Sequence, residues 1–260
     1  MVVDSMSWKD IADELFADLI ESNVIGKSTT WIREKHNRYV KVYGDRKERC
    51  RFKEFTLKSA RNNRFYIVPI AMNKTSLKKN GASKIYIVFF PYRRGMCVCT
   101  LSVDAINRRM TPDFYLPHFF DRYRERFAGD EKSEEFRNTV YDFLLYNGET
   151  ITEKVPDSKY GEDAIFTRCV DGIMLGHEYD NIHLYKTFIA DDMLFDEQIA
   201  KSYDLEMKLY DYMNKNQKES YIKQEPLTLQ EIEFCDKFKE ILKEKIGTTR
   251  IPKSAITKRI

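Results

Sequence analysis

Four short runs rich in aromatic and β-branched residues constrain the fold of this chain most strongly. They cover residues 52–58, 64–71, 84–91 and 96–103. Residues of these types favour extended strands that pack against neighbours in a sheet. A turn signal ending in Gly95, which tolerates positive φ, separates the last two runs. The four runs therefore predict an antiparallel β-meander.

Two features within the meander affect its expected layout. Pro69 interrupts the second run, and proline cannot donate a hydrogen bond to a strand ladder. We therefore expect this run to be an edge strand or to carry a β-bulge at Pro69. Residues 73–83 are basic and contain the turn-forming pair Asn80-Gly81, so we expect a long loop there.

Helical patterns precede the meander. Ser7 and Asp10 have the spacing of an N-terminal capping box, and apolar residues recur on one face behind them. The pattern predicts a first helix that ends near residues 23–26. A second helix is expected to begin after Thr30 and to end at Gly44, a natural C-terminal stop.

Two further helices are predicted between residues 117 and 146. In the first of them His118, Arg122 and Arg126 stack at i, i+4 and i+8, which forms a cationic ridge along the helix. The ridge could contact a phosphate backbone or could be a solvated face, and the sequence leaves both interpretations open. The adjoining apolar stripe, expected to face the core, consists of Leu116, Phe119, Tyr123 and Phe127.

Strands and then more helices are predicted to complete the chain. The pair Asp171-Gly172 lies between two apolar runs and is a strong hairpin signal. Charged helices are expected at about residues 196–214 and 228–246, and a basic tail follows them. The strands of this half are expected at residues 150–155, 164–170, 173–177 and 182–189.

Composition narrows the class of protein. The chain has 260 residues, enough to bury a core, and a net charge of only +3. No run approaches the roughly eighteen apolar residues of a membrane helix, and the N-terminus lacks a secretory signal pattern. Cys97 and Cys99 share one face of a strand, which favours core packing over metal or redox use. We expect a cytoplasmic protein that does not contact membranes.

The motifs of the common cofactor and metal enzymes are missing. The chain has no glycine-rich phosphate loop, no His-Glu-x-x-His helix and no Gly-x-Ser-x-Gly elbow. The nearest acidic pair that could hold Mg²⁺ is Asp191-Asp192, and adjacent acids at a strand end more often cap the following helix. We therefore expect no cofactor and no metal site.

Basic and aromatic side chains offer a chemistry that needs no metal. Cleavage of RNA requires a base for the 2′-hydroxyl, an acid for the leaving oxygen and cations for the charge on phosphorus. The candidate catalytic residues are His118, His183 and Tyr185. The candidate nucleic-acid-binding residues are Arg122, Arg126, Lys253, Lys258 and Arg259, of which the last three belong to the basic tail.

Strand geometry decides which residues of the last predicted strand could face a ligand. In a regular strand His183 and Tyr185 share one face, whereas Leu184, Lys186 and Phe188 share the other. His183 and Lys186 therefore cannot both point at one ligand. Because the face with Leu184 and Phe188 looks like core, we prefer His183 and Tyr185.

The residues between 117 and 190 also match a known succession of elements. His118, Arg122 and Arg126 form a His-x-x-x-Arg-x-x-x-Arg helix, and a second helix, the turn Asn147-Gly148 and an antiparallel hairpin follow it. This order resembles a branch of the RelE-like toxin superfamily that is related to the BrnT group. The resemblance implies a RelE-like fold for this region and a toxin-like ribonuclease activity.

These observations predict an α+β protein with antiparallel sheets and flanking helices. We expect a helix-plus-β-meander region in residues 1–112 and a RelE-like helix-helix-antiparallel-sheet region in residues 113–195. Residues 196–260 are expected to form a helical extension with a basic tail.

Two classes of function remain open. The first is an RNA-binding protein or a metal-independent endoribonuclease of toxin-like type, with RNA as its partner. The alternative is a non-enzymatic protein-interaction or accessory protein of a phage or mobile element, with a protein partner. A basic and aromatic surface around His118 would favour RNA, whereas a broad exposed apolar patch would favour a protein.

Overall fold

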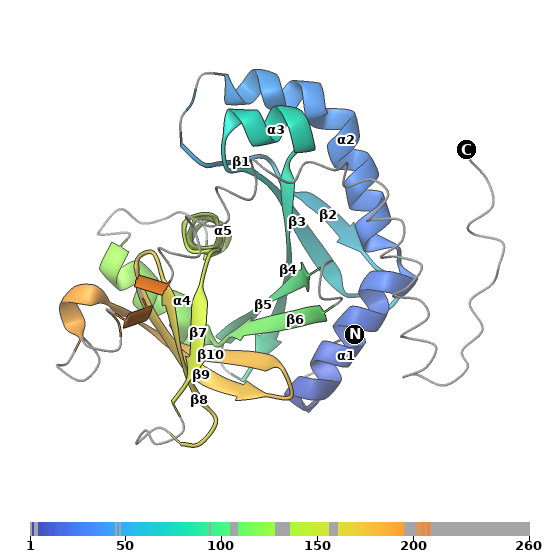
Figure 1. Ribbon diagram of the computed structural model, residues 1–260. Helices are drawn as coiled ribbons and strands as arrows, with labels where there is room; N and C mark the ends of the chain where they lie inside the picture. The colour runs from blue at the N-terminus through green and yellow to red at the C-terminus, as the bar shows by residue number, and fades with distance from the viewer. Residues whose placement is uncertain are drawn as a thin grey trace.

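The structure is a computed structural model in which helices lie on both sides of one large sheet (Figure 1). It describes residues 2, 5–44, 46, 48–93, 95–104, 109–127, 136–155, 161–194, 202, 204, 205, 207 and 208, with the backbone alone at residues 103, 104, 109, 110, 126, 127 and 192. The helices are α1 (Trp8–Glu21), α2 (Val24–Tyr43), α3 (Lys74–Asn80), α4 (Pro117–Phe127), α5 (Phe136–Tyr146) and the 3-10 helix η1 (Asp191–Met193).

The strands form a single sheet with the order β1-β3-β4-β5-β6-β10-β9-β8-β7, and β2 also pairs with β3. Every pairing among the described residues is antiparallel except that of β6 with β10. The predicted α+β class and the antiparallel meander are confirmed. The strands are β1 (Cys50–Arg51), β2 (Phe55–Lys58), β3 (Arg64–Ala71), β4 (Ser83–Tyr92), β5 (Gly95–Asp104), β6 (Arg109–Tyr115), β7 (Ile151–Lys154), β8 (Ala164–Cys169), β9 (Gly172–Tyr179) and β10 (Ile182–Ala190).

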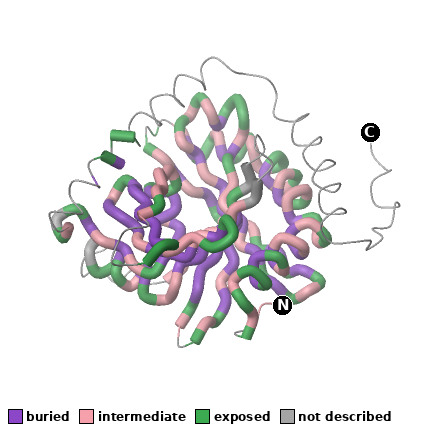
Figure 2. Tube along the Cα trace, turned by 60° about the horizontal axis from the view of Figure 1, so that its bottom comes forward, coloured by how far each residue is buried: buried purple, intermediate pink, exposed green. Residues whose placement is uncertain are grey.

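The sheet separates two hydrophobic cores, because alternate residues of a strand point to opposite faces. On β4, Tyr86 and Val88 belong to the core under α1, α2 and α3. Ile85 and Ile87 of the same strand pack in the second core, which α4 and α5 cover. Figure 2 shows buried residues running along the strands between these helices. The central strands are therefore apolar on both faces.

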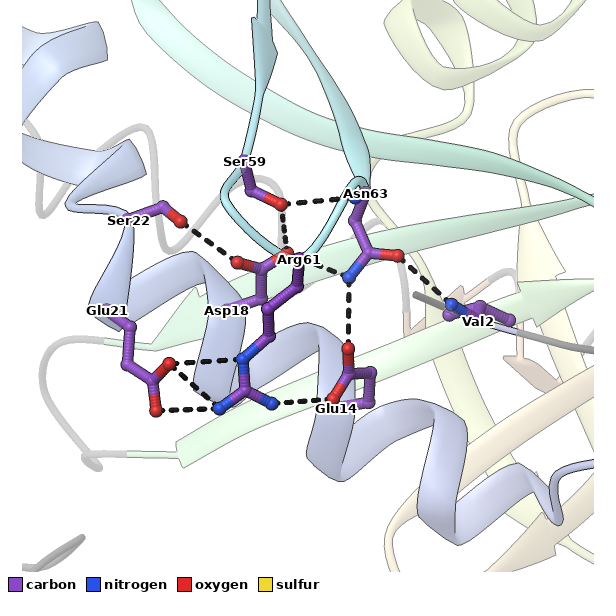
Figure 3. A network of polar contacts seen from close by, with 8 residues as sticks. All are labelled: Val2, Glu14, Asp18, Glu21, Ser22, Ser59, Arg61 and Asn63. Atoms are coloured by element: carbon purple, nitrogen blue, oxygen red, sulfur yellow. Dashed lines mark hydrogen bonds and ion pairs between the residues drawn. The ribbon is translucent and has the colours of Figure 1, made fainter. Parts of the chain in front are cut away.

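A buried carboxylate fastens α1 to the turn between β2 and β3 (Figure 3). Asp18 is fully buried, and it accepts hydrogen bonds from Ser59, from Asn63 Nδ2 at 2.7 Å and from Ser22 Oγ at 2.9 Å. Arg61 of the same turn adds ion pairs to two glutamates of α1. Each buried oxygen is thus satisfied, which offsets the cost of removing the carboxylate from water.

The N-terminal helices follow one another more closely than predicted. The capping box is confirmed, because Ser7 Oγ accepts a hydrogen bond of 3.2 Å from the backbone N–H of Asp10. However, α2 begins at Val24, well before its predicted start. Asn23 adopts a φ of 50°, which lets one helix end and the next begin at once. Gly26 lies inside α2, where a Cβ atom would come within 2.4 Å of Asn23 Oδ1.

The predicted turn between β4 and β5 is confirmed, but Gly95 is needed there for a reason other than a positive φ. The positive φ of the turn is that of Arg93, at 52°. A Cβ atom on Gly95 would lie 2.4 Å from Cβ of Pro117, the first residue of α4. Because glycine has no Cβ atom, Gly95 leaves space for Pro117 at the start of α4, beside the sheet.

Two segments for which the sequence predicts neither a helix nor a strand form regular secondary structure. The basic segment predicted as a loop forms α3, because the Asn73 side chain accepts a hydrogen bond of 2.8 Å from Ser76 N and caps the helix. The segment containing Pro112 forms β6, and the expected region boundary after residue 112 falls inside this strand. β10 pairs with β6 only from Asp113 onward. Pro112 therefore has a neighbouring strand, β5, on only one side.

The prediction that Pro69 lies in an edge strand is wrong, and the one-residue irregularity expected at Pro69 lies in the segment opposite it, between Arg51 and Phe55. β3 lies inside the sheet, with β4 on one side and both β1 and β2 on the other. Pro69 pairs in regular register with Lys84 of β4, and it faces the break between β1 and β2. Phe52 N donates a hydrogen bond of 2.9 Å to the carbonyl of Pro69 there. This contact needs no N–H group from the proline.

Nearly all of the predicted helical extension, residues 196–260, lies outside the described residues. None of the described helices has both the length and the apolar composition needed to cross a membrane. The functional description therefore concerns the sheet and the helices α1 to α5.

Candidate functional site

The candidate site lies where β6 and β10 run side by side as a parallel pair. Asp113 of β6 stands opposite His183 of β10, so both side chains lie on the same face of the sheet. Tyr185 follows on that face, and Thr167 and Thr152 continue the row of polar groups toward β8 and β7. We call Asp113 and His183 the dyad, and these five residues together the polar chain.

Hydrogen bonds connect the polar chain from end to end. His183 Nδ1 is 2.8 Å from Asp113 Oδ1 and 3.4 Å from the Tyr185 hydroxyl. The Tyr185 hydroxyl is 3.2 Å from Thr167 Oγ1, which is 2.8 Å from Thr152 Oγ1. An ionised carboxylate can only accept a hydrogen bond, so Nδ1 carries the proton in this pair. The second ring nitrogen, Nε2, has no hydrogen-bond partner among the described residues, and the His183 side chain is 21% exposed.

Opposing effects act on the pKa of His183. Burial lowers it, but the hydrogen bond and the negative charge of Asp113 raise it more strongly, with a further rise from Glu178. Lys154 lowers it in turn, and this lysine lies 3.3 Å from Glu178. The net result is a pKa above the ordinary histidine value. His183 therefore holds a proton near neutral pH more readily than a free imidazole does.

Tyr185 lies beneath the dyad and supports it. Its side chain is fully buried, and its ring packs 5.2 Å from that of Tyr115. Burial raises the pKa of Tyr185, and the charge of Asp113 raises it further, against the hydrogen bonds from Thr167 and Thr152. The phenol therefore stays protonated. The structure does bring together His183 and Tyr185, the two residues that the sequence indicated on this strand.

A β-bulge corrects the predicted alternation along β10. The register with β9 shifts between Tyr185 and Thr187, so Lys186 is an extra residue in the strand. As a result, Phe188 packs in the same core as Tyr185, whereas Leu184 belongs to the opposite core. The predicted face that joined Leu184 to Phe188 is wrong beyond the bulge. Both faces of β10 are core, and the dyad lies at the border of one of them.

A cleft of about 550 Å³ opens beside the dyad. Asp113, Tyr115 and Tyr185 line its floor together with residues of β4, β5 and the C-terminal end of α5. Asp113 thus contributes to the wall of the cleft and holds the imidazole of His183 at the same time. A ligand in the cleft would lie next to the dyad.

The cationic ridge of α4 lies on the exposed side of this helix. Phe119 and Tyr123 are buried, as the predicted stripe requires, whereas His118 is exposed. Leu116 of the same predicted stripe packs instead against the core on the other face of the sheet, and the side chain of Phe127 lies outside the described part of the structure. Arg122 is exposed as well, and it donates a hydrogen bond of 2.8 Å to Glu125. Within the described residues no hydrogen bond or ion pair joins His118 to the dyad.

The other predicted nucleic-acid-binding residues cannot be placed. The side chain of Arg126 lies outside the described part of the structure, although its backbone belongs to α4. The tail residues Lys253, Lys258 and Arg259 lie outside the described residues altogether. Their part in binding stays a prediction.

Sequence reasoning missed Asp113, the residue that defines the dyad. This aspartate follows Thr111 and Pro112, which were interpreted as a boundary, so no strand was expected there. The signal that could have found it is the apolar pair Phe114 and Tyr115 directly after it, typical of a buried strand. The pairing with His183 joins residues far apart in the chain and leaves no local pattern.

Other candidate chemical groups have structural roles. Cys97 and Cys99 are buried in the core as predicted, and burial raises the pKa of the Cys97 thiol. The carboxylate of Asp191 is held by both terminal nitrogens of Arg168, a buried residue of β8. Among the described residues, no three histidine, cysteine or acidic side chains come together as metal ligands.

Comparison with known proteins gives no relative from which a function could be transferred. No protein-family model, no curated protein and no solved structure matches this chain. The function must therefore be argued from the dyad, the cleft and the charges around them.

Proposed function

We propose that the protein cleaves RNA by acid–base catalysis without a metal ion, and that His183 is the proton-transferring residue. The observation that carries this proposal is the 2.8 Å contact between His183 Nδ1 and Asp113 Oδ1, which orients the ring and leaves Nε2 for the substrate. A histidine held in this way by a carboxylate has a defined tautomer and a stabilised imidazolium form.

The raised pKa suits His183 to the role of general acid. In RNA cleavage the 2′-oxygen gives its proton to solvent water and attacks phosphorus, which forms a 2′,3′-cyclic phosphate, and the bond from phosphorus to the 5′-oxygen breaks. The 5′-oxygen needs a proton as it leaves. His183 Nε2 would supply that proton, and Asp113 would stabilise the imidazolium before the transfer. Tyr185 would keep the ring in place from below.

RNA is the proposed substrate because its phosphates could replace the carboxylate partners of two exposed cations. Arg122 is exposed on α4 beside His118 and pairs with the exposed Glu125, and Lys154, which pairs with Glu178, acts on the charge of the dyad. Each such cation that meets a phosphate releases a counterion and adds affinity. The resemblance of residues 117–190 to RelE-like toxins supports the same substrate and stays a prediction.

Cleavage of a mixed RNA pool in the presence of EDTA tests the proposal. The substitution His183→Gln should lower the rate by about 10² to 10⁴-fold, the usual contribution of a general acid. His177→Gln is a matched control, because His177 lies on the neighbouring strand but pairs with Lys186 on the opposite face. It should leave the rate within a factor of two or so of the parent.

Two outcomes would contradict the proposal. One is a parent protein that leaves the RNA pool intact or cleaves it only with added metal. The other is a His183→Gln variant that cleaves at the parental rate. Either outcome would leave the interaction-protein alternative in its place.

The predicted catalytic role of His118 is tested separately. Because this residue is exposed and has no contact with the dyad among the described residues, its substitution by alanine should not alter the thermal midpoint. A large loss of cleavage in His118→Ala would assign it the second proton transfer. An unchanged rate would restrict the chemistry to the dyad.

A further inference from the structure

The cleft beside the dyad has the size and position of a ligand-binding site. Its volume of about 550 Å³ lies within the range of pockets that enclose a small organic molecule. It is bordered by α3, by the start of β4, by β5 and by the C-terminal end of α5, and Asp113 is one of its lining residues. The occupant of the cleft would therefore be the part of the substrate next to the reacting bond.

The polar groups of the cleft suit an uncharged ligand. Ser83 and Ser102 are exposed residues of its lining, and Thr100 is buried there with its hydroxyl hydrogen-bonded to Tyr115. The charged side chains among its described lining residues are Asp113 and Lys84. Asp113 faces His183, and Lys84 donates a hydrogen bond of 2.6 Å to Thr29. A phosphate inside the cleft would face the carboxylate of Asp113, whereas a neutral hydrogen-bonding group would not be repelled.

Apolar side chains complete the lining. Leu144 of α5 and Met174 of β9 are buried, and Ile85 of β4 is partly buried beside them. Such a surface favours a flat ring with apolar faces and polar edges. A nucleobase has this character, because its faces stack on apolar groups while its edges form hydrogen bonds with hydroxyl groups.

We infer that the cleft binds one unpaired nucleobase of an RNA strand, and that the protein therefore acts on single-stranded RNA. This inference rests on the proposed function for the identity of the polymer. With the base in the cleft beside Asp113, the phosphate attached to its ribose would reach the dyad through His183, which contacts Asp113 at 2.8 Å and does not itself line the cleft. A paired base cannot enter, since its edge and faces are occupied within the duplex.

Binding of a short fluorescein-labelled 2′-O-methyl RNA tests the inference, because this analogue lacks the nucleophile and stays intact. The double substitution Ser83→Leu with Ser102→Leu places two leucines at the mouth of the cleft. It should weaken binding of the single strand roughly 5- to 150-fold, the range expected for the loss of one stacked base. The control Thr56→Leu, at an exposed position of β2 outside the cleft, should bind as the parent does.

A second arm compares the single strand with its duplex. The parent should prefer the single strand, and the double variant should lose most of this preference. Equal affinity of the parent and the double variant, or a preference of the parent for the duplex, would overturn the inference. Thermal midpoints of all three proteins establish that the substitutions leave the fold intact.

The assay separates this inference from the proposed function. Cleavage of RNA with equal binding by the parent and the double variant would reject the cleft as the base site and keep the ribonuclease. Cleft-dependent binding of the single strand without cleavage of ordinary RNA would reject the ribonuclease and support the cleft as a nucleobase site.

Discussion

The hydroxyl of Tyr123 donates a hydrogen bond of 2.8 Å to Asp171 Oδ2 and so ties α4 to the turn between β8 and β9. Asn147, at the end of α5, binds the same aspartate through its side-chain nitrogen at 2.7 Å. Burial raises the pKa of Tyr123, and the bond to Asp171 raises it further, so the phenol remains a donor. One carboxylate thus connects two helices to one hairpin.

Truncation of Tyr123 should therefore destabilise the protein. Tyr123→Ala removes a buried ring and should lower the free energy of unfolding by about 3 to 5 kcal/mol. Tyr123→Phe removes only the hydrogen bond and should cost about 1 to 3 kcal/mol. Tyr179→Ala, at a tyrosine that is 42% exposed, should cost about 1 kcal/mol or less. Urea denaturation measures all three, and a parental midpoint for Tyr123→Ala would disprove the packing of α4.

Asp18 offers a second test of a buried polar group. Asp18→Ala leaves the hydrogen-bond donors of Ser22, Ser59 and Asn63 without their acceptor, so we expect a loss of about 2 to 5 kcal/mol in unfolding free energy. Asp13→Ala on the same helix removes a side chain that is 69% exposed and paired with Lys9. That control should change stability by less than about 0.5 kcal/mol. Similar losses in the two variants would contradict the network.

The dyad predicts a specific dependence of stability on pH. Because the pKa of His183 is raised in the folded protein, the dyad stabilises the fold fully below the ordinary value of 6.5. This contribution is lost as the pH rises through the raised pKa. Asp113→Asn removes the charge that raises it, so burial should then lower the pKa of His183.

The difference in unfolding free energy between the parent and Asp113→Asn should thus be larger at about pH 5 than at about pH 8. Urea denaturation at the two pH values measures this difference, and NMR titration of the His183 ring follows the pKa directly. An equal difference at both pH values, together with an unshifted titration, would show that Asp113 does not control the imidazole.

Local signals in the sequence predicted the elements that depend on local chemistry. The strand β3 begins and ends where the run of aromatic and β-branched residues predicts, and the hairpin signalled by Asp171-Gly172 is present, with its turn at Val170 and Asp171 and with Gly172 as the first residue of β9. The capping box of Ser7 is also confirmed. In the capping box and the hairpin turn, neighbouring residues supply both the pattern and the interaction, whereas β3 takes its pattern from its own residues and its pairing from β1, β2 and β4.

The unpredicted features of the candidate site depend on residues distant in sequence. The parallel pairing of β6 with β10 brings Asp113 to His183, and no periodicity within either strand indicates that contact. The bulge at Lys186 is set by pairing with β9, where a Cβ atom on Gly176 would lie 2.4 Å from the carbonyl oxygen of Leu184. The sequence therefore indicates His183 of the dyad but not Asp113.

The parallel pairing of β6 with β10 also determines when the dyad can form during folding. Asp113 ends the N-terminal succession of strands, and His183 belongs to the last hairpin, with α4, α5 and β7 to β9 between them in the chain. Closing so long a loop is slow compared with forming hairpins. A nascent chain that has completed only the meander holds the carboxylate without its imidazole. The dyad is thus completed only when the two halves of the sheet join, and neither half holds it alone.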